Sequence, residues 1–87
     1  MKKLNELVGT KVLIRTLSFY QVGQVESIDQ GFIFLSSASW IPDTGRFSDC
    51  LSKGTFSEVE PVGECIVNLS AICDVFPWKQ ELPTARK

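Results

Sequence analysis

The sequence predicts an all-β domain, a five-stranded and strongly bent antiparallel barrel. Three short β-rich runs lie between Val8 and Ser37 and are separated by turn-sized gaps, a spacing typical of an antiparallel meander. Gly23 stands in the middle of the second run, where a closing barrel needs a bend or bulge. Further short apolar runs follow after a long polar insertion. Such meanders avoid free edges by closing into a barrel or pairing with another chain.

The first half of the chain is expected to form a short helix and three strands. Leucines and a valine at helical spacing before Gly9 predict a helix over Lys2–Val8. The three expected strands are Lys11–Leu17, Tyr20–Ile28 and Phe32–Leu35, the last extended by Ser36–Ile41. Between the second and third strands, Asp29-Gln30-Gly31 is a tight-turn sequence, because the aspartate bonds backbone amides and the glycine supplies a positive φ.

The second half opens with Pro42–Ser57, an insertion that is too long for a simple hairpin. Apolar residues at helical spacing, followed by Gly54, predict a helix over Arg46–Lys53 within it. The last expected strands are Glu64–Val67 and Ile72–Phe76, and Pro61 places the preceding stretch at an edge or bend. A simple hairpin of these two strands would bring Cys65 and Cys73 together across the ladder. We expect one domain over residues 1–78 and a flexible C-terminal tail over residues 79–87.

Composition favours an oligomeric protein. The chain has 87 residues, enough for one domain, and 44% of them are apolar whereas 22% are charged. This is more apolar surface than a small monomer would hide, so an oligomer interface is expected. A net charge of −1 argues against duplex DNA and membranes as partners. No apolar run is long enough for a signal peptide or a membrane span, which predicts a cytoplasmic protein.

Catalysis, metal binding and cofactors are not expected. The chain has three cysteines and no histidine, so it lacks the usual general base and offers no common zinc-ligand pattern. Buried free thiols in a reducing cytoplasm are the simpler interpretation of the cysteines. Three nearby glutamates, Glu58, Glu60 and Glu64, are interpreted as solvated carboxylates of an edge strand.

The pattern of one helix and five strands resembles the Sm-like (LSm) family over Leu4 to Val75, with the insertion set aside. Gly9 and Val12 match the start of the first strand, Gly23 the bend and Asp29 the turn aspartate, whereas Ile66-Val67 and Ala71-Ile72 match the second motif. The resemblance implies a homo-oligomeric ring in which Glu64–Val67 of one subunit pairs with Ile72–Phe76 of the next. The candidate interface residues are Glu64, Ile66, Val67, Ile72 and Val75.

The resemblance also implies single-stranded RNA binding at turns that face the pore. The candidate residues are Asp29, Gln30, Phe32, Asn68 and Ser70, with Arg46 and Lys53 from the insertion. Phe32 could stack a base or belong to the core, and Asn68 could bond a base edge or its own turn. Arg46 and Lys53 are either plain surface charges or a ring of weak positive charge around one mouth of the assembly.

Several positions depart from the family pattern. Gly31 and Ile33 occupy the places of the stacking residue and the base-binding asparagine. Asn68-Leu69 replaces the arginine-glycine step, and the lysine-histidine pair of bacterial relatives would fall on Leu69-Ser70. Two functions therefore stay open: an RNA-binding ring, and a structural or protein-interaction ring without nucleic acid. A monomeric barrel of the SH3 type is a third possibility.

Overall fold

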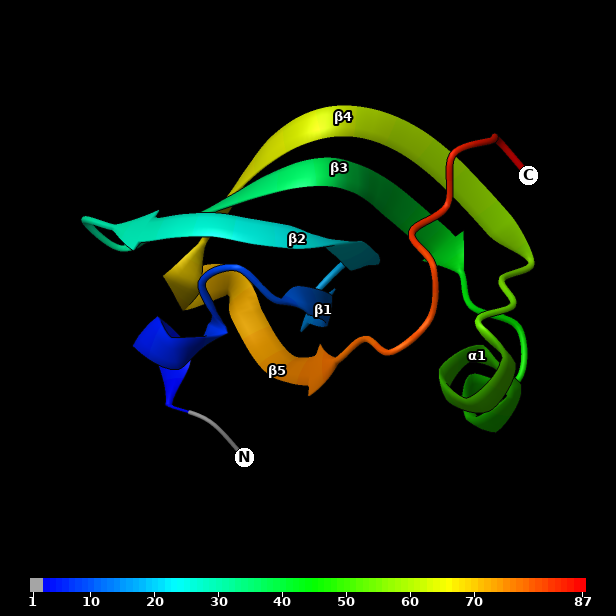
Figure 1. Ribbon diagram of the computed structural model, residues 1–87. Helices are drawn as coiled ribbons and strands as arrows, with labels where there is room; N and C mark the ends of the chain where they lie inside the picture. Colours follow the sequence, from blue (N-terminus) through cyan, green and yellow to red (C-terminus); the bar gives the residue numbers. More distant parts are fainter. Residues whose placement is uncertain (1–2) are drawn as a thin grey trace.

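The computed structural model describes residues 3–87 and shows a single bent sheet with short helices at its margins (Figure 1). The elements are η1 (Leu4–Leu7), β1 (Lys11–Thr16), β2 (Tyr20–Asp29), β3 (Phe32–Asp43), α1 (Phe47–Lys53), β4 (Glu58–Asn68), η2 (Leu69–Ala71) and β5 (Ile72–Pro77). The expected all-β architecture is confirmed, including the helix inserted between β3 and β4. The expected amino-terminal helix is a single 3-10 turn, and Lys2 lies outside the described residues.

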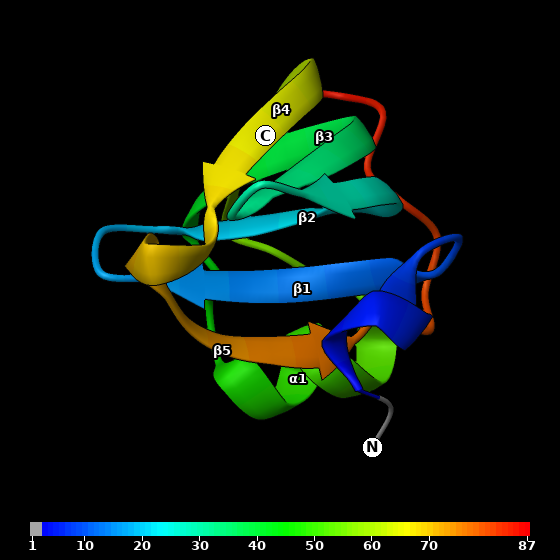
Figure 2. The same cartoon turned by 90° about the vertical axis from the view of Figure 1, so that its left-hand side faces the viewer.

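The five strands form one antiparallel sheet in the order β4-β3-β2-β1-β5. Figure 2 shows the sheet curling so that β4 and β5 form its two margins. The expectation of a simple hairpin between the last two strands is wrong, because β4 pairs with β3 and β5 pairs with β1. The short η2 turn carries the chain from one edge of the sheet to the other. Cys65 and Cys73 therefore lie on opposite edge strands and not across one ladder.

Strand β4 is longer than the sequence suggests. It runs without interruption from Glu58 to Asn68, although its pairing with β3 shifts around Gly63. Gly63 has a φ of 81° and Pro61 cannot donate a backbone hydrogen bond. An edge strand tolerates both residues, since its outer side needs no partner within the sheet.

One face of the sheet closes around a barrel core. Side chains from η1, from β1 to β4 and from the margin of β5 meet there. The buried members are Leu7, Val12, Ile14, Val25, Ile33, Leu35, Ala38 and Val67. Burial of such side chains is the main stabilising contribution in a domain of this size.

The opposite face carries a second cluster, which we call the outer core. Its buried members are Leu13, Val22, Ile41, Cys50, Phe56, Val59 and Trp78. Helix α1 covers this face and ends at Gly54, whose φ of 72° forms a left-handed cap. The Trp78 ring stacks on Phe56 with centroids 5.2 Å apart. Strand β1 thus sends Val12 and Ile14 into one core and Leu13 into the other, because alternate side chains point to opposite faces.

Residues 79–87, for which the sequence predicts a flexible tail, contain no helix or strand and run from β5 to β4 across the outer core (Figure 1). We call this segment the C-terminal strap. The Lys11 ammonium donates to the Gln80 carbonyl at 2.5 Å, and Leu82 packs against the outer core. At its far end, Lys87 and Val59 exchange two backbone hydrogen bonds. Flexibility of the segment stays a prediction, and these are the contacts that it would have to break.

Gly23 lies where the backbone of β3 passes close to β2. The pairing of the two strands shifts between Val22 and Gln24, and Ser37 opposite has a φ of 48°. A Cβ atom added at Gly23 would lie 3.2 Å from the Cα atom of Ala38 and 3.2 Å from the carbonyl oxygen of Ser36. Both are backbone atoms, so the neighbouring strand cannot simply move a side chain aside.

We expect Gly23→Val to lower the free energy of unfolding by about 1–3 kcal/mol, because a side chain would force β3 away from the bend. Urea unfolding followed by tryptophan fluorescence measures this. Gly23→Ala should lie between the wild type and the valine variant. Equal or higher stability of the valine variant would mean that β2 and β3 can separate at this point without cost.

Candidate nucleic-acid interface and sheet edges

The β2–β3 turn and the η2 turn form one surface, which we call the turn cluster, made of Asp29–Phe32 and Asn68–Ser70. Gln30 and Gly31 both have positive φ, 50° and 85°, as a two-residue type I′ turn requires. The Leu69 amide donates to the Gly31 carbonyl at 2.9 Å and joins the two turns. The structure therefore brings together residues that are nearly forty positions apart in the sequence.

Phe32 and Asn68 lie directly opposite each other on β3 and β4. The Phe32 side chain is exposed, with 40% of its surface accessible. The Asn68 side-chain oxygen accepts hydrogen bonds from the amide and hydroxyl of Ser70, at 2.9 and 2.8 Å. Its amide nitrogen makes no hydrogen bond within residues 3–87. An exposed ring beside a free amide donor can stack on a base and bond its edge.

The departures from the family pattern have structural reasons. Ile33, at the position of the base-binding asparagine, is fully buried in the barrel core. Leu69, in the arginine-glycine step, packs against the same core. These side chains stabilise the barrel and are not available to a ligand. Asp29, Gln30 and Ser70 are exposed at the surface of the turn cluster.

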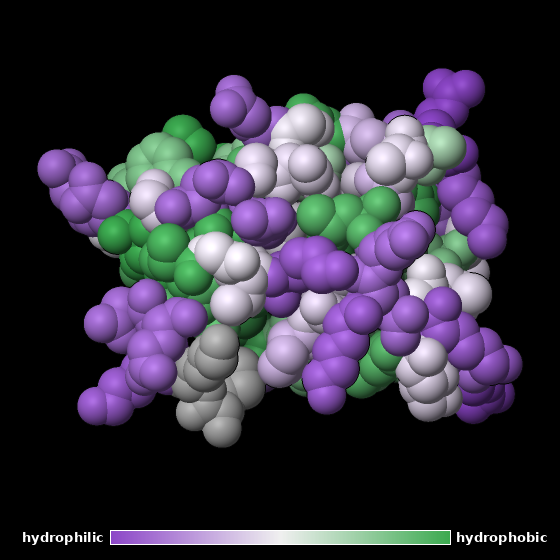
Figure 3. Space-filling view, in the orientation of Figure 1, coloured by the Kyte–Doolittle hydropathy of each residue, from purple (hydrophilic) through white to green (hydrophobic). Residues whose placement is uncertain are grey.

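The hydropathy of the surface is mixed in this region. Figure 3 shows hydrophobic side chains at the surface among hydrophilic ones, on the left-hand side that carries the β2–β3 turn. Exposed apolar side chains of the edge strand include Ile66 and Val62. The turn cluster itself contributes one carboxylate, Asp29, and no cationic side chain. A nucleic acid would therefore be held here by stacking and hydrogen bonds, and less by charge.

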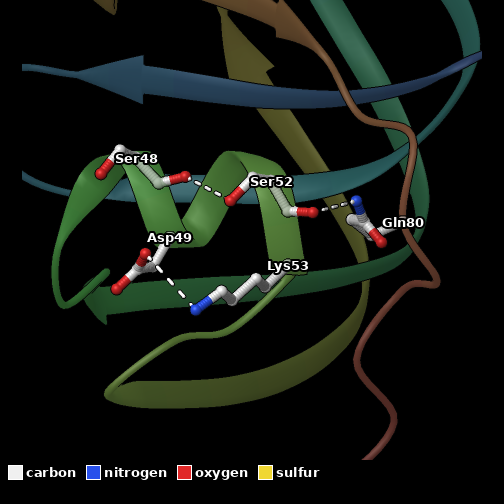
Figure 4. Close-up of polar contacts among 5 residues, drawn as sticks. All are labelled: Ser48, Asp49, Ser52, Lys53 and Gln80. Atoms are coloured by element: carbon white, nitrogen blue, oxygen red, sulfur yellow. Dashed lines mark hydrogen bonds and ion pairs between the residues drawn. The ribbon is translucent and has the colours of Figure 1, made fainter.

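Arg46 and Lys53 are not part of the turn cluster. Arg46 is the N-cap and Lys53 the last residue of α1, which Figure 1 places at the opposite end of the sheet from the β2–β3 turn. The Lys53 ammonium lies 3.8 Å from the Asp49 carboxylate on the same helix (Figure 4). This exposed pair reduces the local positive charge. The candidate RNA-binding residues thus form two separate groups.

An aromatic groove that the sequence did not reveal borders the turn cluster. The rings of Phe19 and Trp40 have centroids 5.2 Å apart and a tilt of 31°, and both side chains are about 40% exposed. The groove holds about 310 Å³ and is lined by Thr16, Ser18, Phe19, Gln21, Trp40, Ile66, Val67, Asn68 and Ala71. Asn68 belongs to both surfaces. In the sequence, no pattern distinguishes Trp40 from the core residue Ile41 beside it.

The two margins of the sheet differ in their side chains. Glu64 and Ile66 on β4 are exposed, Ile66 at 60%, whereas Val67 is buried in the barrel core. Ile72 and Val75 on β5 are half-buried and pack against that core. Of the five candidate interface residues, Glu64 and Ile66 therefore offer the most accessible side chains. The others would contribute through their backbones.

The cysteines lie in different environments. Cys50 is buried in the outer core, Cys65 is half-buried on β4, and Cys73 is exposed on β5. Burial raises the pKa of the Cys50 and Cys65 thiols. The Cys65 sulfur lies 3.8 Å from the Gln21 side-chain oxygen. Within residues 3–87, no group of three or more acidic, cysteine or histidine side chains could hold a metal ion, and no helix there is long and apolar enough to cross a membrane.

Comparison with known proteins identifies the class of fold. No protein-family model matches the chain, and no curated protein matches its sequence. Among solved structures, it is similar to a heptameric archaeal Sm protein, with a TM-score of 0.58 and 20% sequence identity. The match covers 83% of this chain and 90% of the archaeal chain. The protein therefore has a divergent Sm-like fold.

We expect Cys73 to react first with a thiol reagent, because the thiolate is the reactive form and the other two thiols are shielded with raised pKa values. Mass spectrometry after brief treatment with iodoacetamide at neutral pH should find one label on the folded protein and three after unfolding. Cys73→Ser should abolish the fast label. Rapid labelling of Cys50 would contradict the burial of the outer core.

Proposed function

We propose that this chain is a non-enzymatic Sm-like module that assembles into a homo-oligomeric ring and binds single-stranded RNA in the cytoplasm. The observation that carries the ring is the pair of open sheet margins. Within the described residues, no strand covers the outer side of β5 or of the second half of β4. Backbone groups along such edges are paired in stable proteins by another strand or protected by other devices.

A ring follows when these two margins pair between subunits. Residues Glu64–Val67 of one copy would join Ile72–Phe76 of the next, which is a head-to-tail contact that closes through rotation. The Ile66 side chain would then be buried from water between the two copies. The similar archaeal protein is heptameric, which supports a closed assembly of this fold.

RNA binding would use the turn cluster of every subunit. Phe32 would stack a base, and the amide nitrogen of Asn68 would donate to an acceptor on a base edge. The Phe19–Trp40 pair offers a second aromatic surface next to Asn68. In a ring, the turn clusters of several subunits would contact the same RNA, so that weak contacts together would give a higher affinity. Arg46 and Lys53, at the other end of the sheet, would attract phosphate without regard to sequence.

A structural or protein-interaction ring is the second candidate. The burial of Ile33 and the absence of cationic side chains from the turn cluster favour it. This ring would join through the same open sheet edges as the RNA-binding ring. It would differ only in that its turn cluster binds no nucleic acid. Assembly and RNA binding are therefore tested separately.

For assembly, we expect Ile66→Glu to weaken the oligomer by at least about tenfold in dissociation constant, because a carboxylate would be buried at the joint. Native mass spectrometry and light scattering over a concentration series measure this. Val62→Glu is the matched control, since Val62 is an exposed apolar residue of the same strand outside the pairing stretch. A wild-type chain that stays monomeric at micromolar concentration would overturn the ring.

For RNA, we expect Phe32→Ala to weaken the binding of short oligonucleotides by roughly 1–3 kcal/mol, or about five- to 150-fold in Kd, through lost stacking. Asn68→Ala should weaken some bases more than others. Lys53→Ala should weaken U-rich and A-rich RNA alike and reduce the salt dependence. Fluorescence anisotropy at several salt concentrations measures all three.

Each variant in the RNA experiment must still assemble as the wild type does. Equal losses for Phe32→Ala and Lys53→Ala would mean that charge, and not the turn cluster, holds the RNA. An intact ring that retains neither U-rich nor A-rich RNA at low salt would establish the structural alternative.

A further inference from the structure

We infer that the C-terminal strap is an edge cover supplied by the chain itself, which blocks the first half of β4 and confines pairing with a second copy to the second half. The inference concerns the joint of the proposed ring and deepens it. It also makes a separate claim about the monomer, that Lys87 occupies the β4 edge beside Val59.

The blocking contact is a strand-like pair. The Val59 amide donates to the Lys87 carbonyl at 2.8 Å, and the Lys87 amide donates to the Val59 carbonyl at 2.9 Å. Two residues that exchange both bonds form a hydrogen-bonded antiparallel pair. The Val59 backbone groups are therefore satisfied on the side that faces away from β3, and no other chain can pair there while the strap is in place.

The strap is anchored along its length. Trp78, directly before the strap, donates its backbone amide to the Lys11 carbonyl at 3.0 Å and stacks its ring on Phe56. The Gln80 side-chain amide donates to the Ser52 carbonyl at 3.1 Å (Figure 4). A Cβ atom added at Gly54 would lie 2.8 Å from the Gln80 side chain, so the strap lies close against the end of α1. Figures 1 and 2 both show it passing from the end of β5 to β4.

The residues that follow Val59 extend the blocked region. The alternation of an antiparallel ladder turns Pro61 to the same outer side as Val59, and a proline has no amide hydrogen to offer. Gly63, with a φ of 81°, then shifts the pairing with β3. An incoming strand finds a regular edge only beyond this glycine, from Glu64 to Asn68. That stretch is close in length to β5, Ile72–Pro77.

This arrangement gives the strap a function in assembly. Without it, β4 presents an edge of eleven residues, and a six-residue β5 could pair at more than one register. A closed ring needs one register at every joint, since a shifted joint changes the rotation between subunits. The strap selects that register by removing the alternatives.

The test compares the full chain with a chain shortened after Thr84, which lacks both bonds to Val59, and with a matched pair of point variants. Lys87→Ala keeps the backbone bonds, whereas Lys87→Pro removes the amide that donates to the Val59 carbonyl. Hydrogen exchange followed by NMR measures the exchange rate of the Val59 backbone amide. The exchange rate of the Trp78 amide serves as an internal reference for an intact fold. Native mass spectrometry and light scattering read the assembly.

We expect the Val59 amide to exchange at least about tenfold faster in the shortened chain, with unchanged exchange at Trp78. Lys87→Ala should behave as the wild type and form one oligomer. The shortened chain and Lys87→Pro should give several subunit numbers or aggregate. If the Val59 amide exchanges equally fast in the full and shortened chains, the contact between the strap and β4 is wrong. If it exchanges faster in the shortened chain but the oligomer is unchanged, the strap does not select the pairing register.

The proposed ring can fail independently. If the full chain is monomeric, the ring is wrong, and the strap is then judged on whether the shortened chain self-associates. Self-association supports the strap as a block on β4. A shortened chain that also stays monomeric overturns it.

Discussion

The structure depends on one constraint: a single five-stranded sheet has apolar side chains on both faces and only 87 residues with which to cover them. Bending covers one face, because the sheet curls around the barrel core. Helix α1 and the C-terminal strap cover the other face as the outer core. Gly23 suits the bend, since a Cβ atom there would lie only 3.2 Å from the backbone of β3 and would push it outwards.

The bend, α1 and the strap cover the two faces of the sheet, but they leave part of its two edge strands unpaired. Strands β4 and β5 lie at the two margins of the sheet and are not paired with each other within residues 3–87. The strap satisfies Val59, and Pro61 removes one donor, but the rest of the edge stays available. Strand β4 thus contributes to the stability of the single chain and also carries the edge at which the proposed ring would join its copies.

The turn cluster is a consequence of the pairing of β3 with β4. The bond between Leu69 and Gly31 joins the turns at the ends of two strand pairs, and it sets Phe32 beside Asn68. Ile33 and Leu69, at two positions where the resemblance to Sm-like proteins would place base-contacting residues, pack in or against the barrel core. This surface presents an exposed ring and an amide, with the Phe19–Trp40 pair nearby.

The sequence by itself determined the local elements: strands with alternating apolar residues, the turn at Gln30-Gly31, the bend at Gly23 and the helix that ends before Gly54. These are governed by short-range sterics and periodicity, which a sequence displays directly. Only the tertiary structure decided that β4 joins β3, that Arg46 and Lys53 lie far from the turn cluster, and that Trp40 is exposed while Trp78 is buried. It also decided that Lys87 pairs with Val59. Those relations depend on how far the sheet bends, and the bend is the sum of contacts between residues that are distant in the chain.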